Sequence, residues 1–285
     1  MPFPKRVLEL YTYTAEQGLS REEWQTVLTG EYCRYLEGRC DKIRKSQPKI
    51  TIGSCTAGFK GSPVMICPHR FLQRRQIFMD ALHLLRNHTP GNQLHVVSEI
   101  AIPGGSVDYF VTSVSRGEVR DYVALEIQTL DTTGTVWPAR QQFLEALQIN
   151  QTQGEPMGGK QSYGMNWKMT AKTILVQLHH KLKTLELLGK NMVLVFQDVF
   201  FHYVTAEFST SGLRDATPGD SAHFHVYSLN QEGSGAFSIE LAERRSTTAA
   251  GIEQMLGMQR SADLPEEMLL ARIQAKISDA TLLRI

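Results

Sequence analysis

Apolar and polar residues alternate along three neighbouring segments in the middle of the chain, at 95–102, 107–114 and 119–130. The turn residues at 103–106 (Pro-Gly-Gly-Ser) and at 116–117 (Arg-Gly) separate these segments. Alternation with a period of two between such turns is typical of antiparallel strands. We therefore expect a three-stranded meander here.

A spacing of three and four residues between apolar positions predicts helices on both sides of the meander. Ser20 and Glu23 form a capping-box pattern, and we expect the helix that follows them to reach the first cysteine. Further helices are predicted at 70–87, 138–148 and 167–188. The longest of them carries one apolar face, formed by Ala171, Ile174, Leu175, Leu178, Leu182 and Leu185.

Apolar runs in the second half of the chain predict more strands, at 191–199, 200–208, 223–229 and 236–241. Two short helices are expected to close the chain, and a Gly- and Gln-rich loop is expected at 151–163. This mixture of elements indicates an α/β (α+β) fold, with helices packed on a mixed sheet.

Composition and charge exclude few classes of protein. The chain has 285 residues, 42% of them hydrophobic, and a formal net charge of +1, so total charge implies no particular partner. The N-terminus lacks the apolar core of a signal peptide, and no apolar run approaches the roughly 20 residues that span a bilayer. We expect a cytoplasmic protein with no membrane partner, in a reducing compartment.

The four cysteines of the chain, Cys33, Cys40, Cys55 and Cys67, lie in one short segment. In a reducing compartment such clustering favours a metal over disulfides. Four thiolates can hold zinc or iron in a tetrahedral sulfur site. Such a site would help to fold the glycine- and proline-rich segment 42–79, which we expect to be mainly loop. The alternative is four unrelated buried cysteines that act as small hydrophobic residues.

Basic residues dominate the same part of the sequence, since no Asp or Glu occurs between Lys42 and Met79. A face of one charge sign suits contact with nucleic-acid phosphates, although a solvated surface is the simpler interpretation. Arg140, outside this segment, is a further candidate for contact with guanine. The candidate DNA-binding residues are Lys42, Arg44, Lys45, Lys49, Lys60, Arg70, Lys160 and Lys168.

Four polar side chains occur on the predicted meander where a core would favour apolar ones: Glu99, Asp108, Glu126 and Gln128. Residues two apart on a strand face the same side, so Glu126 and Gln128 project together. Crowded carboxylates repel one another, and a divalent cation such as Mg²⁺ relieves this repulsion and can activate water against a phosphodiester. Acids on a solvent-facing side of the sheet are the alternative.

This set of four residues resembles the catalytic pattern of the PD-(D/E)XK nuclease superfamily. Two positions depart from that pattern, because Gln128 stands where the motif has lysine and Val107 where it has proline. The motif's lysine orients or stabilises the attacking water. A neutral amide can orient water but supplies no charge, which leaves the activation of the nucleophile open.

The cysteines followed by the segments 98–100, 105–110 and 126–135 resemble the NotI group of type II restriction endonucleases. The resemblance implies a homodimer that cleaves GC-rich palindromes with Mg²⁺ and holds iron or zinc on its four cysteines. It implies that Asp108 and Glu126 bind magnesium, that Gln128 orients water, and that Glu99 is an accessory acid. The implied partners are double-stranded DNA and a cognate DNA methyltransferase.

Three functions remain open at this point. The first is a site-specific DNA endonuclease, with a DNA-contacting four-cysteine module at 1–70 and a PD-(D/E)XK nuclease domain at 71–285. The second is a repair or homing-type nuclease of the same superfamily, which would prefer mismatched or branched DNA. The third is a DNA-binding regulator whose acids are structural and whose cysteine module recognises DNA.

Overall fold

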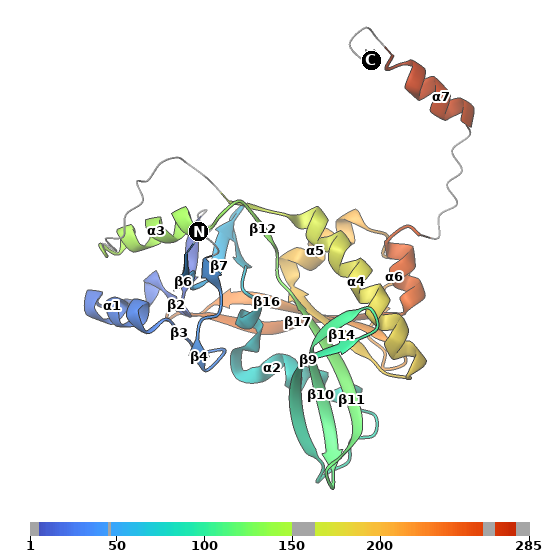
Figure 1. Ribbon diagram of the computed structural model, residues 1–285, viewed down its shortest axis with the longest axis horizontal. Helices are drawn as coiled ribbons and strands as arrows, with labels where there is room; N and C mark the ends of the chain where they lie inside the picture. The colour runs from blue at the N-terminus through green and yellow to red at the C-terminus, as the bar shows by residue number, and fades with distance from the viewer. Residues whose placement is uncertain (1–5, 45–46, 150–162, 259–265, 278–285) are drawn as a thin grey trace.

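The computed structural model describes residues 6–44, 47–149, 163–258 and 266–277. A seven-stranded sheet ordered β15-β17-β16-β14-β11-β10-β9 forms its centre (Figure 1). Strands β11, β14 and β16 are parallel neighbours, and the other pairs are antiparallel, so the sheet is mixed. Its strands are β9 Gln93–Ile102, β10 Gly105–Ser115, β11 Glu118–Gln128, β14 Met192–Gln197, β15 Arg214–Asp215, β16 Ala222–Gln231 and β17 Phe237–Thr247.

The meander predicted from the alternating pattern is confirmed as β9, β10 and β11, which pair in sequence order. It forms one end of the sheet, and β9 is the edge strand. In Figure 1 the three strands extend away from the helical part of the molecule as a long ribbon. The two turns lie where the glycines at 104–105 and 117 adopt positive φ angles, a conformation that glycine adopts readily because it has no Cβ.

Helices cover both faces of the sheet. On one face lie α4 (Trp167–Leu187), α5 (Asp198–Glu207) and α6 (Ala249–Met255), which contact β10, β14, β16 and β17. On the other lie the 3-10 helix η2 (Pro68–Arg75), α2 (Gln76–Ala81) and η3 (Leu82–Leu84). A hydrophobic cluster therefore lies on each face of the sheet, and β11 contributes side chains to both. Ala124 belongs to one cluster, and Val123 and Leu125 belong to the other.

The N-terminal part builds a second sheet of four antiparallel strands, ordered β2-β1-β7-β8. Its strands are β1 Val7–Leu10, β2 Tyr13–Thr14, β7 Ser54–Phe59 and β8 Ser62–Met65. The helices α1 (Arg21–Gly30) and α3 (Trp137–Ala146) lie beside it, and the rings of Trp24 and Phe143 meet with centroids 5.5 Å apart. Residues on both sides of position 70 therefore share one core. The domain boundary expected at position 70 stays a prediction.

The remaining elements are short. They are the 3-10 helix η1 Ala15–Gln17, the strand pairs β3 Tyr32–Cys33 with β4 Gly38–Arg39, β5 Ile43–Arg44 with β6 Gln47–Thr51, and β12 Thr132–Thr133 with β13 Gly164–Met165, and the helix α7 Glu266–Gln274. Within the described ranges, no helix is both long enough and apolar enough to cross a membrane.

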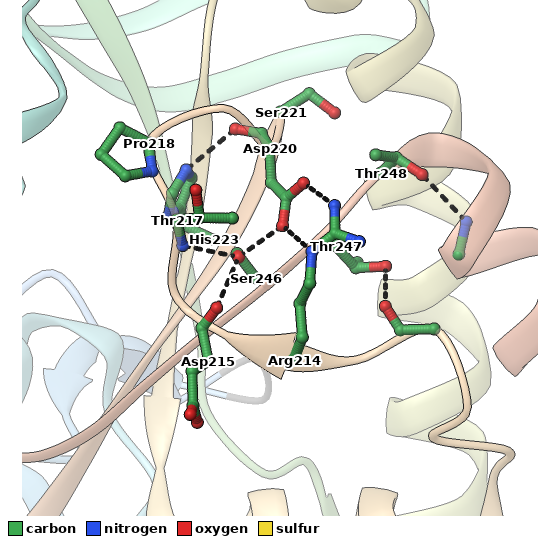
Figure 2. A network of polar contacts seen from close by, with 12 residues as sticks. Arg214, Asp215, Thr217, Pro218, Asp220, Ser221, His223, Ser246, Thr247 and Thr248 are labelled. Atoms are coloured by element: carbon green, nitrogen blue, oxygen red, sulfur yellow. Dashed lines mark hydrogen bonds and ion pairs between the residues drawn. The ribbon is translucent and has the colours of Figure 1, made fainter.

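A polar network fixes the end of the sheet opposite the meander (Figure 2). The carboxylate of Asp220 accepts hydrogen bonds from the guanidinium of Arg214, on β15, and from the hydroxyl of Ser246, on β17. The same hydroxyl accepts a bond from the Thr217 amide at 3.0 Å. A single buried carboxylate thus ties the loop before β16 to two other strands.

Four expectations about local structure need correction. The segment 200–208 is not a strand but part of helix α5, because Phe200, Phe201 and Val204 recur at helical spacing and all face the core. The predicted helix at 70–87 is broken into short pieces, since Arg74 and Arg75 have positive φ angles.

The capping box is confirmed, as Ser20 and Glu23 exchange both of its hydrogen bonds. The helix nevertheless ends at Gly30, short of Cys33. The glycine- and proline-rich segment 42–79 is not mainly loop, because it contains β6, β7 and β8. Almost all of the loop predicted at 151–163 lies outside the described residues.

Candidate active site

The structure brings Asp108 and Glu126 together on adjacent strands. The Oδ2 atom of Asp108, on β10, accepts a hydrogen bond of 2.8 Å from the backbone amide of Ile127, which directly follows Glu126 on β11. Alternation along β11 turns Ile127 towards the α2 side of the sheet and Glu126 towards α4. The two carboxylates therefore lie at one place on the α4 face.

Burial and a neighbouring negative charge destabilise the charged forms of both acids. Burial raises the pKa of Asp108, with the Ile127 amide and the charge of Lys181 acting against it. Burial, and then the neighbouring charge of Asp108, raise the pKa of Glu126. The Oε2 atom of Glu126 is buried and has no hydrogen-bond partner among the described residues. A buried carboxylate oxygen without a partner is costly, and a cation would remove that cost.

A buried lysine beside these acids was not identified from the sequence as part of the site. The Nζ atom of Lys181, on α4, donates to Oε1 of Glu126 at 2.5 Å, and the side chain of Lys181 is 6% exposed. The sequence contains a signal for it, because Lys181 falls three positions after Leu178 and four before Leu185, on the apolar face of the helix. A lysine on a buried face requires a partner.

Gln128 lies at the end of β11 and lines a cleft of about 670 Å³. Its side-chain amide donates to the carbonyl of Thr129 at 2.5 Å. The cleft runs from the end of β11 to the segment that carries Cys67. Its polar wall includes His69 and Asp41, and the Nε2 atom of His69 lies 2.9 Å from the Oδ2 atom of Asp41. The side chain of Gln128 is half-buried. Because it lines the cleft, it can contact a molecule bound there.

Glu99 lies on β9 across from Asp108. The pairs Ile100 with Val107 and Ser98 with Tyr109 bracket these two residues in the register of the strands. Glu99 has a φ angle of 56° and an exposed side chain, and its charge contributes to the raised pKa of Asp108. It is therefore an exposed acid at the rim of the pair that Asp108 and Glu126 form.

The four cysteines are all buried and free. Burial raises the pKa of each thiol, and the charges of neighbouring cysteines contribute: Cys33 raises the pKa of Cys40, and Cys33 and Cys40 both raise that of Cys67. In the part of the chain that the structure describes, no three His, Cys, Asp or Glu side chains adopt an arrangement that could hold a metal ion. The cysteines thus gather in one region without forming a ligand shell.

Two of the basic candidates cannot reach a phosphate. Arg70 is fully buried and forms an ion pair of 2.9 Å with Glu9, so its charge is neutralised inside the protein. Arg140 is 2% exposed and donates to the carbonyl of Ile52. The burial of Arg70 was not predicted from the sequence, because its partner Glu9 lies far before the segment 42–79 that has no acids.

The other basic candidates fall into three groups. Lys49, Lys60 and Lys168 are exposed. Lys42 and Arg44 are half-buried, Lys42 with its ammonium on the carbonyl of Ile66 and Arg44 against the ring of Trp137. Lys45 and Lys160 lie outside the described residues.

Comparison with known proteins identifies the class of enzyme. The family model described as Restriction endonuclease NotI matches residues 29–236, which include the four cysteines, the meander and α4. The class is that of the type II site-specific deoxyribonucleases, which act on double-stranded DNA. The chain belongs to the NotI restriction endonuclease family, as the cysteine and carboxylate motifs indicated. A search of curated proteins finds no match.

Proposed function

We propose that this restriction endonuclease cleaves a short, GC-rich palindrome by magnesium-dependent hydrolysis of a phosphodiester, with a PD-(D/E)XK-type active site on β10 and β11. The observation that carries the proposal is the hydrogen bond from the Ile127 amide to Asp108, which holds the acid of one strand beside Glu126 of the next. Glu126 is buried and Asp108 is half-buried, and two such acids fixed side by side are suited to binding a hard cation.

The residues of the site fit a magnesium ion. Asp108 and Glu126 are its ligands in this proposal, since Oε2 of Glu126 is a buried oxygen that lacks a partner among the described residues. Bound magnesium would polarise the phosphodiester and lower the pKa of a water molecule. Gln128 orients that water from the wall of the cleft, and Glu99 is an accessory acid at the rim.

We further propose that Cys33, Cys40, Cys55 and Cys67 hold a structural iron or zinc ion, whose binding would bring together thiols that form no ligand shell in the described structure. Backbone amides support this donor set: those of Tyr35 and Leu36 favour the thiolate of Cys33, and those of Thr12 and His69 favour the thiolates of Cys55 and Cys67. Such hydrogen bonds stabilise sulfur ligands. The ion would supply a cross-link between β3, β7 and the start of η2.

A palindromic site requires two-fold symmetry, so the proposed enzyme is a homodimer. The exposed lysines at 49, 60 and 168 are its proposed phosphate contacts. The cell that makes such an enzyme needs a cognate DNA methyltransferase to protect its own recognition sites.

Digestion of a large phage DNA by the purified protein, in magnesium and separately in EDTA, tests the proposal. Discrete fragments that require magnesium and share one palindrome at their ends are the expected result. Preferential cutting of mismatched or branched duplexes would favour a repair-type nuclease. Sequence-specific binding without cleavage, unchanged in Asp108→Ala, would favour a regulator.

A further inference from the structure

The active site contains a positive charge that the motif does not place there. Lys181 comes from helix α4, 55 residues after Glu126 in the sequence, and its ammonium contacts Oε1 of that carboxylate. Both side chains are less than one-tenth exposed. Removing an ammonium from water is costly unless it is paired, so a lysine at this position is held by its partner.

The packing around Lys181 directs its side chain at the acid. The turn between β9 and β10 touches the backbone of α4: a Cβ atom on Gly104 would lie 2.8 Å from the carbonyl carbon of His180 and 2.9 Å from the amide nitrogen of Lys181. On Gly105 it would lie 3.2 Å from Cε of Lys181. Thr184, one turn further along the helix, donates to the carbonyl of Pro103 at 3.1 Å. Two glycines thus let the helix approach the strand that carries Asp108.

Without Lys181, the negative charges around Asp108 and Glu126 would have no positively charged partner in the described part of the chain. Asp108, Glu126 and Glu99 bring three negative charges, and Gln128 is neutral. Within the described ranges, Lys181 is the basic residue that forms an ion pair with one of these acids. Its bond to Oε1 leaves Oε2 of Glu126 free to face a metal ion.

We infer that Lys181 is a positioning residue for DNA cleavage, which supplies from α4 the positive charge that Gln128 lacks and fixes Glu126 for its role in the site. This inference rests on the proposed function of Asp108 and Glu126. It adds a residue from a helix to a site whose motif lies entirely on strands. Preorganised charge of this kind acts on the chemical step rather than on DNA binding.

Single-turnover cleavage of a duplex that carries the mapped site, at saturating magnesium, tests the inference with Lys181→Met and Lys181→Arg. Lys183→Met is the matched control, since Lys183 lies on the same helix but is 58% exposed. We expect Lys181→Met to cleave about 100-fold more slowly, because the loss of one preorganised charge has an effect on that order. Lys181→Arg should retain more than about a tenth of the wild-type rate, and Lys183→Met nearly all of it.

DNA affinity in calcium and the melting temperature are measured for each variant, so that cleavage rates are compared only between proteins that fold and bind DNA. We expect Lys181→Met to keep the DNA affinity of the wild type and to melt at a lower temperature, because the buried carboxylate of Glu126 loses its partner. A rate within about threefold of the wild type would overturn the inference, as would a slower rate matched by an equal loss of DNA affinity. If Asp108→Ala also cleaves normally, the proposed function fails; if only Lys181→Met does, the failure is confined to this inference.

A double variant keeps the test valid if Lys181→Met does not fold. Gln128→Lys/Lys181→Met returns an ammonium to the same face of β11, two residues from Glu126. Cleavage restored by at least about tenfold over Lys181→Met, or measurable where that variant is unfolded, supports a role for the charge. A double variant that folds and binds DNA but does not cleave, while the single variant Gln128→Lys does cleave, overturns the inference.

Discussion

The Oδ2 atom of Asp108 accepts a hydrogen bond of 2.8 Å from the backbone amide of Ile127. This bond links β10 and β11 through a side chain, next to the Tyr109–Leu125 pair at which the register of the two strands ends, where both strands carry acids. Asp108 thus has one role that the structure shows, as the acceptor for the Ile127 amide, and one that we propose, as an ionised metal ligand, and the two can be separated.

Substitutions of Asp108 should separate these roles. Asp108→Asn keeps an oxygen to accept the Ile127 amide, whereas Asp108→Ala leaves that amide without a partner, at a cost of about 1–3 kcal/mol. Both variants should lose cleavage, and Asp108→Ala should be the less stable by urea denaturation. Equal stability of the two would contradict the structural role of the hydrogen bond.

Arg70 should matter for folding rather than for DNA binding. It is fully buried, pairs with Glu9 and donates to the carbonyl of Phe237 at 2.6 Å. Removing one member of a buried pair leaves an unpaired charge, so we expect Arg70→Met to lower the free energy of unfolding by about 3–5 kcal/mol.

The exposed Lys60→Met is the control for Arg70→Met, and it should leave stability within about 0.5 kcal/mol. Urea denaturation of the two variants provides the comparison. An Arg70→Met protein as stable as the wild type, but with weaker DNA binding, would restore Arg70 to the DNA-contacting set.

Two buried histidines should make the protein sensitive to acid. Burial lowers the pKa of His223 to about 4 and that of His225 to about 2, and the ring of His83 stacks on His225 with centroids 5.8 Å apart. An unfolded histidine binds its proton near pH 6.5, so the unfolded state takes up more protons than the folded state below that pH. Stability is therefore fully present above about pH 6.5 and falls as the pH drops towards the folded pKa values.

Replacement of His225 tests this relationship. Between about pH 7.5 and pH 5 each buried histidine should lower stability by on the order of 2 kcal/mol, and His225→Leu should remove one such contribution. His95→Gln, at an exposed position on β9, should leave the pH dependence unchanged. Urea denaturation at the two pH values measures the effect, and an unaltered slope in His225→Leu would contradict it.

Gly104 should be required for contact between the meander and α4. Its φ angle is +98°, and an added Cβ would lie within 3 Å of the helix backbone, whereas Gly91 has a similar φ of +95° and nothing within 4 Å. Both Gly→Ala variants carry the backbone strain, of about 1 kcal/mol, but only Gly104→Ala must also displace α4. Thermal denaturation should show Gly104→Ala as clearly the less stable. Equal losses in the two variants would mean that the contact is unimportant.

The meander could be predicted from the sequence because its signals are local. Alternating apolar residues and glycine turns determine β9 to β11, and with them the neighbourhood of Asp108 and Glu126. Helix α5 was predicted wrongly as a strand, since its aromatic and β-branched residues favour strands on average. Its burial against the sheet on one face outweighs that preference.

The contribution of Lys181 could not be found by the same means. Its partner Glu126 lies on a strand far away in the sequence, and the approach of the two depends on glycines in a third element. The burial of Arg70 is similar, because its partner Glu9 comes from β1. Local patterns specify elements, but ion pairs between elements arise from packing.

The most direct test of the account compares two buried acids of the same strand. Glu126→Gln removes a proposed metal ligand, whereas Asp121→Asn, five positions earlier on β11, removes a carboxylate that pairs with Lys190 away from the site. Single-turnover cleavage in magnesium should fall by at least about 1,000-fold in Glu126→Gln and by less than about threefold in Asp121→Asn, with DNA binding in calcium retained by both. Normal cleavage by Glu126→Gln would contradict the assignment of the active site to β10 and β11.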